Sequence, residues 1–471
     1  MILAIVLPLL TLAVLLASLW SAWKAVRTAR TPQGAVGWVV FLLTAPYIAL
    51  VAYLFLGHHR YRHYLVSRRE SGRVIEAAGD FAVRFAPGHA PDGLNPRPFE
   101  KLAAMGATRG NDMQLLIDGD ATFEALFAAI DGAQRYILAQ FFIIHDDEIG
   151  RAFADRLIQA ADRGVTVRLI FDPIGSRTLP VDYLRRLRDA GVKVPGKRKL
   201  SRRAGRLQMN YRNHRKTLIV DGRQGFTGGL NVGDEYLGRD PKFGHWRDTF
   251  VRLTGPIVSQ LQLVFAEDWH WGTGETLISP LHWEPEPAEA DMTGLILPAG
   301  PADDMETGTL FFLSAIVAAK HRLWVASPYF VPDTDILSAL KQAALRGVDV
   351  RILVPDAIDH TLPWLAAFAA FDECRAAGVE IWRYGDGFLH EKVVLVDDSM
   401  AAVGSMNMDN RSFRLNFETM AVLFDSRAAR DVAAMLEADF AQAWKLDRPL
   451  SRQKLGIRLG APFARLFAPL L

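Results

Sequence analysis

Cysteine is nearly absent from this sequence. Cys374 is the only one among 471 residues, which excludes an internal disulfide framework and a cysteine-rich metal site. Metal-ligand sets of His, Asp and Glu are also missing, so we expect no metal and no other cofactor. Half of the residues are hydrophobic, which is enough to bury a large core in about three domains, or in two with extra segments.

Charged residues are missing from two stretches near the N-terminus, residues 1–23 and 31–57. A helix of about 20 apolar residues crosses a hydrocarbon core of roughly 30 Å, so each stretch is long enough to span a membrane. A secretory signal peptide is the alternative for the first stretch, but it has no basic start and no clear cleavage site. We therefore expect residues 1–73 to form a two-helix transmembrane hairpin followed by a basic juxtamembrane segment.

Arginines gather directly after the second stretch. Residues 58–73 contain five of them, whereas the loop between the two stretches, residues 24–30, has three cations. Because cytoplasmic segments carry the excess of Lys and Arg, this distribution favours a multi-pass protein with both ends of the hairpin in the cytoplasm. The rest of the chain is then expected on the cytoplasmic side.

Acidic residues are missing from residues 190–220. The cations in this gap include Lys197, Arg198, Lys199, Arg202, Arg203, Arg206 and Arg212. Such a basic run is commonly a solvated loop. The alternative, favoured by the membrane stretches, is an electrostatic funnel for an anionic substrate or an anionic lipid surface. Because aromatic residues for base stacking are not interleaved through residues 197–206, we expect no nucleic acid as a partner.

Two stretches of the chain repeat each other. Residues 163–172 and 346–355 share the pattern Arg-Gly-Val-x-Val-Arg followed by apolar residues. Each follows an apolar run typical of a strand and then an amphipathic run typical of a helix. The order strand, helix, strand, helix, strand predicts an α/β fold, with two tandem sandwich repeats and mixed sheets. We place the repeats at residues 100–285 and 286–448, with a tail at 449–471.

Each repeat carries the pattern His-x-Lys-x-x-x-x-Asp. Its residues are His214, Lys216 and Asp221 in the first repeat and His390, Lys392 and Asp397 in the second. A glycine and an asparagine follow both copies at the same offsets, and one copy alone would be weak support for a site. Two matched copies predict one active site built from two halves.

Two facing histidines suit phosphoryl transfer through a covalent enzyme intermediate. One neutral imidazole attacks phosphorus, while the other, protonated, donates to the leaving oxygen. Both imidazoles titrate near neutral pH, so complementary protonation states are accessible. Lys216 and Lys392 are expected to place positive charge on the non-bridging phosphate oxygens, a role that a metal plays elsewhere.

Polar residues after the two motifs have expected supporting roles. Asn231, Ser405 and Asn407 are candidate hydrogen-bond donors to the substrate. A histidine nucleophile also needs an acid on its other ring nitrogen, and Asp248 and Glu418 are the candidate orienting acids. The alternative for both acids is an ordinary salt bridge at a strand end.

The chain resembles the phospholipase D superfamily, and within it the bacterial cardiolipin synthases. The most specific stretches are residues 387–397, 403–409, 411–418, 213–221, 227–231 and 328–333. Two positions depart from the pattern: Gly229 stands where the other half has Ser405, and Glu391 places an acid inside the second motif. Because side chains alternate along a strand, we expect Glu391 to point away from the site.

The resemblance implies a specific reaction at a bacterial inner membrane. One phosphatidylglycerol gives its phosphatidyl group to an enzyme histidine and releases glycerol. The glycerol hydroxyl of a second phosphatidylglycerol then takes the group, giving cardiolipin. In similar enzymes the N-terminal motif often supplies the nucleophile, which implies His214 as nucleophile and His390 as acid and then base. The implied role of Asp221 and Asp397 is to hold the site together.

Other functions stay open at this point: a membrane-bound hydrolase of the phospholipase D type, another phosphatidyltransferase, or a lipid-binding scaffold. A lipid acceptor is favoured over water because a membrane-tethered site works where lipid hydroxyl groups are concentrated. Intact His and Lys in both repeats argue against a scaffold. The expected partners are anionic phospholipids, phosphatidylglycerol in particular, and no feature of the sequence sets an oligomeric state.

The tail combines cations with apolar residues. Arg452, Lys454, Arg458 and Arg465 alternate with leucine, isoleucine and phenylalanine. This composition is typical of a basic amphipathic helix on a lipid surface, and also of a terminal helix packed on the core.

Overall fold

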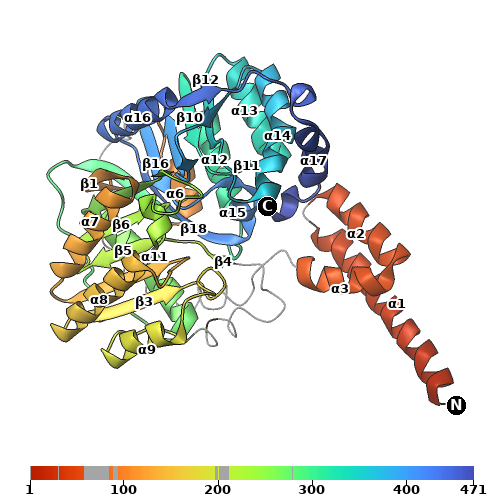
Figure 1. Cartoon of the computed structure of the whole chain (residues 1–471), viewed down its shortest axis with the longest axis horizontal. Helices are drawn as coiled ribbons and strands as arrows, with labels where there is room; N and C mark the ends of the chain where they lie inside the picture. Colours follow the sequence, from red (N-terminus) through yellow and green to blue (C-terminus); the bar gives the residue numbers. More distant parts are fainter. Residues whose placement is uncertain are drawn as a thin grey trace.

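The computed structural model of this chain describes residues 2–29, 31–57, 84–87, 94–196, 200, 212–277 and 279–471. The described part consists of three apolar N-terminal helices beside an α/β body (Figure 1). The expected basic juxtamembrane segment, residues 58–73, lies outside the described residues, as does nearly all of the basic run 197–212.

The N-terminal helices are α1 (Ile2–Thr28), α2 (Pro32–Thr44) and α3 (Pro46–Leu56). Within α1, residues 5–28 form the one helix of the described chain that is long and apolar enough to cross a membrane. Most of its large side chains, Leu16 and Trp20 among them, are exposed. Such an apolar surface is stable in contact with lipid chains, whereas its exposure to water costs free energy.

The second expected span is not one helix. It breaks at Ala45 into α2 and α3, which have 13 and 11 residues. Pro46 accounts for the break, because its ring lacks an N–H and disfavours a helical residue before it. The two helices are only roughly 20 and 17 Å long, too short to cross a hydrocarbon core of about 30 Å. The expectation of two membrane-spanning helices is therefore not confirmed.

The two short helices fold back on each other beside α1. At the start of α3, the Tyr47 hydroxyl donates to Thr11 Oγ1 at 3.4 Å. Near its end, Tyr53 is buried in a cluster with Ala25 of α1 and packs edge-on against Trp38 of α2, with ring centroids 5.0 Å apart. Thus α3 returns toward the end of α1 at which α2 begins (Figure 1).

A 15-stranded sheet forms the centre of the body. Its strands are β1 (Thr108–Ile117), β2 (Tyr136–Phe141), β3 (Thr166–Phe171), β4 (Arg212–Asn213), β5 (Thr217–Val220), β6 (Gln224–Gly228), β8 (Thr249–Thr254), β9 (Met292–Ala299), β10 (Arg322–Ala326), β12 (Asp349–Pro355), β13 (Glu380–Tyr384), β15 (Val393–Val396), β16 (Met400–Gly404), β18 (Asn416–Leu423) and β19 (Ala443–Lys445). Two short pairs stand apart, β11 (Phe330–Val331) with β17 (Met408–Asp409) and β7 (Trp246–Arg247) with β14 (Phe388–Leu389).

The order across the sheet is β19-β13-β12-β10-β15-β16-β18-β9-β1-β8-β6-β5-β2-β3, with β4 beside β18. Parallel pairs such as β2–β3 and β10–β12 lie among antiparallel ones, so the sheet is mixed, as predicted. Sequence reasoning gave each repeat its own sheet. The structure instead makes one sheet, because β1 pairs antiparallel with β9. On either side of this joint the strands follow the same order, and the motif strands β5 and β15 occupy equivalent places.

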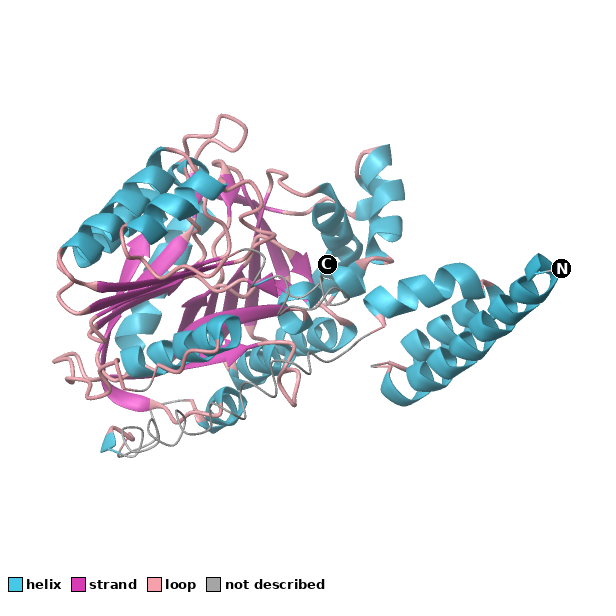
Figure 2. Ribbon diagram, turned by 90° about the horizontal axis from the view of Figure 1, so that it is seen from below, coloured by secondary structure: helices cyan, strands magenta, loops and turns pink. Residues whose placement is uncertain are grey.

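Helices cover both faces of the sheet (Figure 2). One face carries α7 (Asp118–Asp131), α8 (Glu148–Asp162), α9 (Val181–Asp189), α12 (Thr307–Ala318), α13 (Thr334–Leu345) and α14 (Thr361–Ala376). The other face carries α11 (Ile257–Thr273) and α16 (Ser426–Ala441). Two further helices, α15 (Asn410–Arg414) and α17 (Leu455–Arg465), flank the second repeat.

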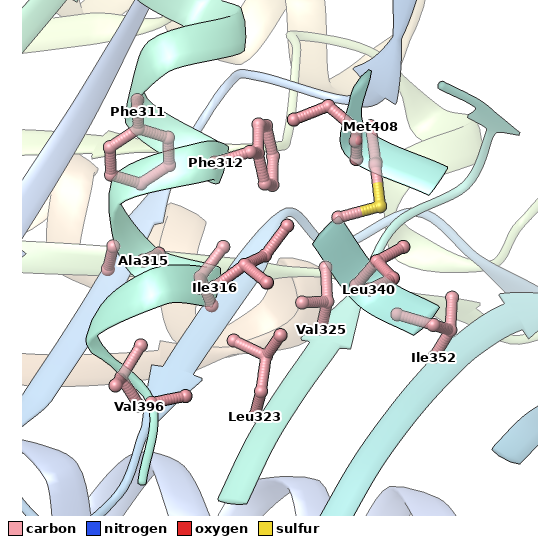
Figure 3. Close-up of a cluster of buried hydrophobic side chains, with 14 of the residues drawn as sticks. Phe311, Phe312, Ala315, Ile316, Leu323, Val325, Leu340, Ile352, Val396 and Met408 are labelled. Carbon is pink, nitrogen blue, oxygen red and sulfur yellow. The ribbon is translucent and has the colours of Figure 1, made fainter. Parts of the chain in front are cut away.

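The core of the second repeat shows how the sequence pattern sets these layers. Phe312 and Ile316 of α12 pack with Leu323 and Val325 of β10 on one face of the sheet (Figure 3). Between those two strand residues, Trp324 points to the opposite face and joins the cluster under α11 and α16. Strand alternation thus buries apolar side chains on both faces, each contributing roughly 25 cal/mol per Å² removed from water.

Helix α6 (Arg97–Ala103) precedes the first repeat in the chain but packs in the core of the second. The ring of its Phe99 lies 6.0 Å from that of Phe311 and 5.4 Å from that of Phe424. The expected start of the first repeat, residue 100, falls within α6. The division expected between residues 285 and 286 falls in the segment between α11 and β9.

Candidate active site

Two short parallel strand pairs carry the motifs across the joint between the repeats. Strand β4, just before His214, pairs with β18, and β14, just before His390, pairs with β7. The backbone N–H of His214 donates to the Phe417 carbonyl at 2.9 Å, and that of His390 donates to the Arg247 carbonyl at 2.7 Å. Each histidine is thus docked on the opposite repeat by its own backbone.

His214 is held by Glu418. Its Nδ1 lies 3.0 and 2.9 Å from the two carboxylate oxygens. The carboxylate also accepts from the hydroxyls of Ser405 and Ser412, at 2.6 and 2.9 Å. Because an ionised carboxylate only accepts hydrogen bonds, Nδ1 carries the hydrogen and Nε2 keeps its lone pair. The His214 side chain is 11% exposed and that of Glu418 is 0% exposed, so the accessible part of this pair belongs to the imidazole.

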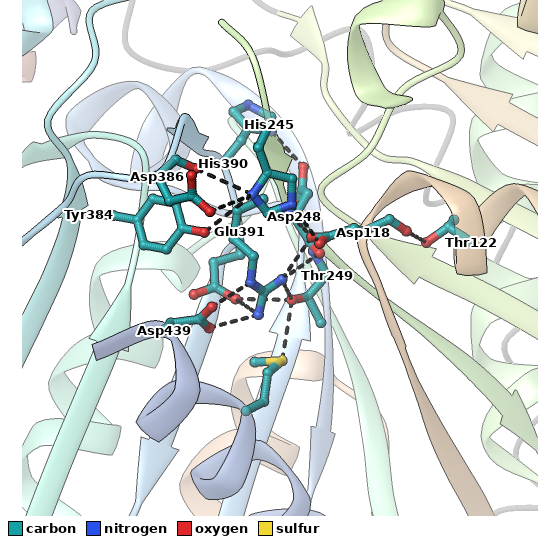
Figure 4. Close-up of polar contacts among 12 residues, drawn as sticks. Asp118, Thr122, His245, Asp248, Thr249, Tyr384, Asp386, His390, Glu391 and Asp439 are labelled. Carbon is teal, nitrogen blue, oxygen red and sulfur yellow. Dashed lines mark hydrogen bonds and ion pairs between the residues drawn. The ribbon is translucent and has the colours of Figure 1, made fainter. Parts of the chain in front are cut away.

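His390 is held in the same way by Asp248 (Figure 4). Its Nδ1 lies 2.7 Å from Asp248 Oδ2, and the other carboxylate oxygen accepts from the Thr249 backbone N–H at 2.8 Å. The pairing crosses the repeats: Asp248 follows the first motif but serves the second histidine, and Glu418 follows the second motif but serves the first. Sequence reasoning named both acids as candidates and left this pairing open.

Burial lowers the pKa of both imidazoles. The pKa of His214 falls to about 4, because burial outweighs the attraction of Glu418. The pKa of His390 lies well below its ordinary value, for the same reason and because of the charges of Lys392 and Lys216. Each ring is thus influenced by the lysine of the other repeat, so both stand in one electrostatic site. At pH 7 both imidazoles are neutral, the state in which one can attack or accept a proton.

The two orienting acids differ in their electrostatics. Burial raises the pKa of Asp248 to about 6, although the charge of Lys392 opposes the shift. Burial also acts to raise the pKa of Glu418, but the charge and hydrogen bond of His214 and the charge of Lys216 bring it below its ordinary value. Both are ionised at pH 7, and Glu418 holds its negative charge more strongly.

The lysines of the motifs are buried beside the histidines. Lys216 Nζ donates to the His214 carbonyl at 2.7 Å, and Lys392 Nζ donates to the His390 carbonyl. Burial lowers the pKa of Lys392 to about 8 and that of Lys216 well below its ordinary value. An ammonium has three hydrogens, so each lysine keeps donors for another group. The described part of the chain has no group of three His, Cys, Asp or Glu arranged for a metal ion.

The expected substrate donors are mostly engaged within the protein. The fully buried Ser405 hydroxyl donates to Glu418, so in this structure it supports the orienting acid. Asn231 Oδ1 accepts from the Ile143 backbone N–H at 3.0 Å, and its Nδ2 donates to the Tyr236 hydroxyl at 3.0 Å. Ser405 and Asn231 thus both have partners within the protein, and their roles as substrate donors stay predictions. Asn407 is also buried, and its role as a substrate donor stays a prediction.

Gly229 explains one departure from the family pattern. A Cβ atom at this position would lie 2.0 Å from Asp248 Oδ1. The shorter Asp248 side chain therefore comes so close to the backbone that only glycine fits. In the other half the equivalent Ser405 hydroxyl reaches the longer Glu418 instead.

The motif aspartates lie away from the histidines. Asp221 follows β5, at the end opposite His214, and its carboxylate accepts from the backbone N–H groups of residues 134, 135 and 136 at 2.9, 2.7 and 2.9 Å. Asp397 accepts from residues 320, 321 and 322 in the same way. Both adopt left-handed backbone, with φ of 56° and 50°. They close the turns after the motif strands and do not contact the imidazoles.

Both repeats match one family model. Residues 126–269 and 312–444 match the model described as cardiolipin synthase, PLD-like domain. Cardiolipin synthase A of Pseudomonas fluorescens is 44% identical over 449 residues, which cover 93% of this chain and 93% of that one. The chain belongs to the cardiolipin synthase family. Cardiolipin synthase A of Pseudomonas aeruginosa is 44% identical over 457 residues, 93% of this chain and 91% of that one.

Among solved structures, the crystal structure of phosphatidylserine synthase from Haemophilus influenzae is similar in fold. It superposes with a TM-score of 0.57 at 15% identity, and the match covers 76% of this chain and 95% of that one. At this identity the likeness shows a shared phospholipase D-like fold and nothing of the substrate. The body of this cardiolipin synthase family member thus has a known α/β architecture.

The residue between His and Lys of each motif points away from the site in this cardiolipin synthase family member. Arg215 pairs with Asp268 of α11 at 2.6 Å. Glu391 accepts from Thr249 Oγ1 at 2.9 Å and lies 3.2 Å from Arg247, which also binds Asp439 of α16 (Figure 4). The expected orientation of Glu391 is confirmed. Sequence reasoning missed Arg247, whose only signal was its place beside Asp248.

A second group near His390 was also missed. The Tyr329 hydroxyl donates to Asp359, and His360 Nδ1 lies 2.8 Å from the same carboxylate. The charge of Asp359 acts on the pKa values of His390 and Lys392, raising both against the effect of burial. Tyr329 lies in the stretch 328–333 that already resembled the cardiolipin synthases, whereas Asp359 carried no sequence signal.

Proposed function

We propose that this protein transfers a phosphatidyl group from one phosphatidylglycerol to another, giving cardiolipin and glycerol through a phosphohistidine intermediate. The observation that supports this best is the reciprocal pairing of His214 with Glu418 and of His390 with Asp248. It gives two neutral imidazoles, each with a free Nε2, next to two buried lysines. Such a set suits one phosphorus atom exchanged between two alcohols.

In the first half-reaction His214 is the proposed nucleophile. Its Nε2 forms a bond to phosphorus as the bond from phosphorus to the glycerol oxygen breaks. Ionised Glu418 stabilises the positive charge that grows on the imidazole. Lys216 and Lys392 stabilise the non-bridging oxygens. The leaving oxygen takes a proton from His390, whose pKa rises when the anionic phosphate enters beside it.

In the second half-reaction the neutral His390 takes the proton of the glycerol hydroxyl of a second phosphatidylglycerol. This oxygen attacks phosphorus, the phosphorus–nitrogen bond breaks, and cardiolipin leaves with His214 restored. Water could make the same attack and give phosphatidic acid. A site held at a membrane favours the lipid hydroxyl, because that group is concentrated at the surface.

For the membrane segment we infer one crossing and one re-entrant pair. The length of α1 suits a span, whereas α2 and α3 are short and α3 returns to the end of α1 where α2 starts. The arginines of residues 58–73 favour the cytoplasm for this end, and with it the repeats at 100–285 and 286–448. The start of α1 would then lie across the inner membrane, in place of the sequence-based hairpin with both ends inside.

Mapping a covalent adduct tests the chemistry. The full-length protein in phosphatidylglycerol vesicles is quenched during turnover in alkaline detergent, and its peptides are examined by mass spectrometry. We expect a phosphatidyl group on His214 in the wild type and none in His214→Ala. Cardiolipin and glycerol in equal amounts support the transferase. Phosphatidic acid alone would make the protein a hydrolase, and a fully active His214→Ala variant would refute the proposed nucleophile.

A further inference from the structure

Helix α17 presents its large apolar side chains outward. Leu455, Leu459, Phe463 and Leu466 are exposed by 66%, 59%, 67% and 74%. Their spacing of four, four and three residues puts them on one face of the helix. We call these four residues, of which Leu466 is the C-cap of the helix, the outer face of α17.

The inner face of α17 consists of Ile457, which packs against the core of the second repeat, and of small residues. Ala461 and Ala464 are buried, and a Cβ atom on Gly460 would lie 3.1 Å from the Leu365 side chain of α14. At Gly460 the approach to α14 is too close for a larger side chain. The orientation is thus fixed by packing, and it is the reverse of the pattern in a helix that covers a water-soluble core.

The charge around the outer face points to an anionic partner. Arg452, Lys454, Arg458 and Arg465 flank it, and the chain has no Asp or Glu from residue 448 to residue 471. Large apolar side chains bordered by cations, without acids, are the composition of helices that lie in the surface of anionic bilayers.

One end of the outer face lies across a cavity from the apolar N-terminal helices. A cavity of about 780 Å³ is lined by Thr28 and Trp38 on one side and by Arg465 and Leu466 on the other. In Figure 1, α17 and the C-terminus lie on the side of the body that faces α1, α2 and α3. A bilayer that surrounds those helices would therefore reach α17.

We propose that α17 lies in the surface of an anionic bilayer, with its outer face among the lipid chains, and so holds the second repeat against the membrane. The inference deepens the proposed function, on which it rests for the supply of lipid substrate. It also ties the membrane to the site. The Arg411 backbone N–H donates to the Leu471 oxygen at 2.6 Å, and the neighbouring Ser412 donates to Glu418.

A depth measurement tests the contact without requiring turnover. Full-length Cys374→Ala protein carrying Phe463→Cys is labelled with an environment-sensitive fluorophore and reconstituted in vesicles of phosphatidylglycerol and phosphatidylethanolamine. The control is Val181→Cys, at a position that is 71% exposed. It belongs to α9, which lies on the far side of the body from the N-terminal helices (Figure 1). We expect lipid-attached quenchers to reach position 463 and not position 181. Equal quenching by aqueous iodide at both positions would overturn the proposal, as would protection at 463 from both quenchers.

A kinetic comparison tests the consequence. The variant Leu459→Gln/Phe463→Gln/Leu466→Gln should lose about tenfold or more in rate on phosphatidylglycerol in vesicles, because lost apolar insertion weakens surface binding. On short-chain phosphatidylglycerol below its micelle concentration it should stay within about twofold of wild type. The matched control is Val181→Gln/Leu345→Gln, which changes exposed apolar residues elsewhere. Equal losses on both substrates, or no loss on vesicles, would contradict the proposal. Wild-type protein that forms no cardiolipin would refute the proposed function alone, since the depth measurement stands apart from it.

Discussion

His214 Nδ1 lies 2.9 Å from a carboxylate oxygen of Glu418, a residue 204 positions further along the chain. The equivalent contact joins His390 to Asp248 at 2.7 Å. Each imidazole therefore depends on the other repeat for its orientation and for the charge that stabilises its protonated form. Neither repeat holds a complete histidine–acid pair of its own.

Replacing Glu418 with Gln should lower kcat by about 10³-fold or more, because an amide cannot stabilise an imidazolium. Asp248→Asn should have a similar effect on the second histidine. Single-turnover measurements separate the two, since Glu418 serves adduct formation and Asp248 serves proton transfer in both steps. The control is Asp398→Asn, whose side chain is 88% exposed. Wild-type turnover in Glu418→Gln would show that the pairing has no catalytic role.

A serine at position 229 should harm the site even though Ser405 occupies the matching place. The added Cβ would lie 2.0 Å from Asp248 Oδ1, so Asp248 must move and His390 loses its orientation. Misplacement of about 1 Å costs on the order of 10²-fold in rate. Gly106→Ala is the control, since a Cβ there meets nothing within 4 Å. The test is the steady-state rate measured at equal amounts of folded protein. A Gly229→Ser variant with the wild-type rate would contradict the close contact between residue 229 and Asp248.

Activity should fall above about pH 8. Lys392, with a pKa of about 8, is charged below that pH and neutral above it, and only the charged form stabilises the phosphate oxygens. In Lys392→Arg the fall in kcat/KM should move beyond pH 10, whatever the absolute rate, because arginine stays protonated. Glu391 has a raised pKa of about 8 owing to burial, so Glu391→Gln is the matched control. If the fall in activity above pH 8 disappears in Glu391→Gln and persists in Lys392→Arg, the titrating residue is Glu391 and not Lys392.

Removing a motif aspartate should affect stability more than chemistry. Asp221→Ala leaves three backbone N–H groups without their acceptor and places alanine at a φ of 56°. We expect a loss of about 1–3 kcal/mol of folding free energy, seen as a lower Tm. Asp221→Asn, which tolerates left-handed backbone, should lose less. Turnover per folded molecule should remain within about threefold of wild type. A normal Tm with no turnover would instead place Asp221 in the chemistry.

The fold-back of α2 and α3 predicts opposite locations for the N-terminus and the repeats. In a Cys374→Ala background, an N-terminal epitope should be reached by protease from outside intact spheroplasts. A cysteine at Val181 should react with a membrane-impermeant maleimide only in inverted vesicles. Two full spans would put both positions on the same side, and that labelling pattern would contradict the single crossing.

The sequence was sufficient for the repeats, the two motifs and the candidate acids, since these follow from local periodicity and spacing. The partners of Asp248 and Glu418 could not be predicted, because they depend on pairings between β4 and β18 and between β7 and β14 over long sequence separations. Order along the chain left open which acid serves which histidine. The direction of the chain after Pro46 could not be predicted either, because a charge-free stretch has the same composition whether its helix continues or turns back.

Ser405 shows a further limit. Its position beside the motif made it a plausible donor, but only the neighbourhood of its hydroxyl decides between a substrate and Glu418. Arg247 and Asp359 carried no periodic signal at all, since a buried ion pair is recognised by its partners and not by its spacing.

The pairing of β1 with β9 has a consequence for how substrates and products enter and leave the site. Domain closure needs a hinge at a loosely packed boundary, and here the boundary is the interior of a sheet. The two repeats are therefore expected to keep one geometry throughout the cycle. Glycerol must therefore diffuse out before the second lipid diffuses into the same unchanged site. The covalent intermediate must persist between these two steps.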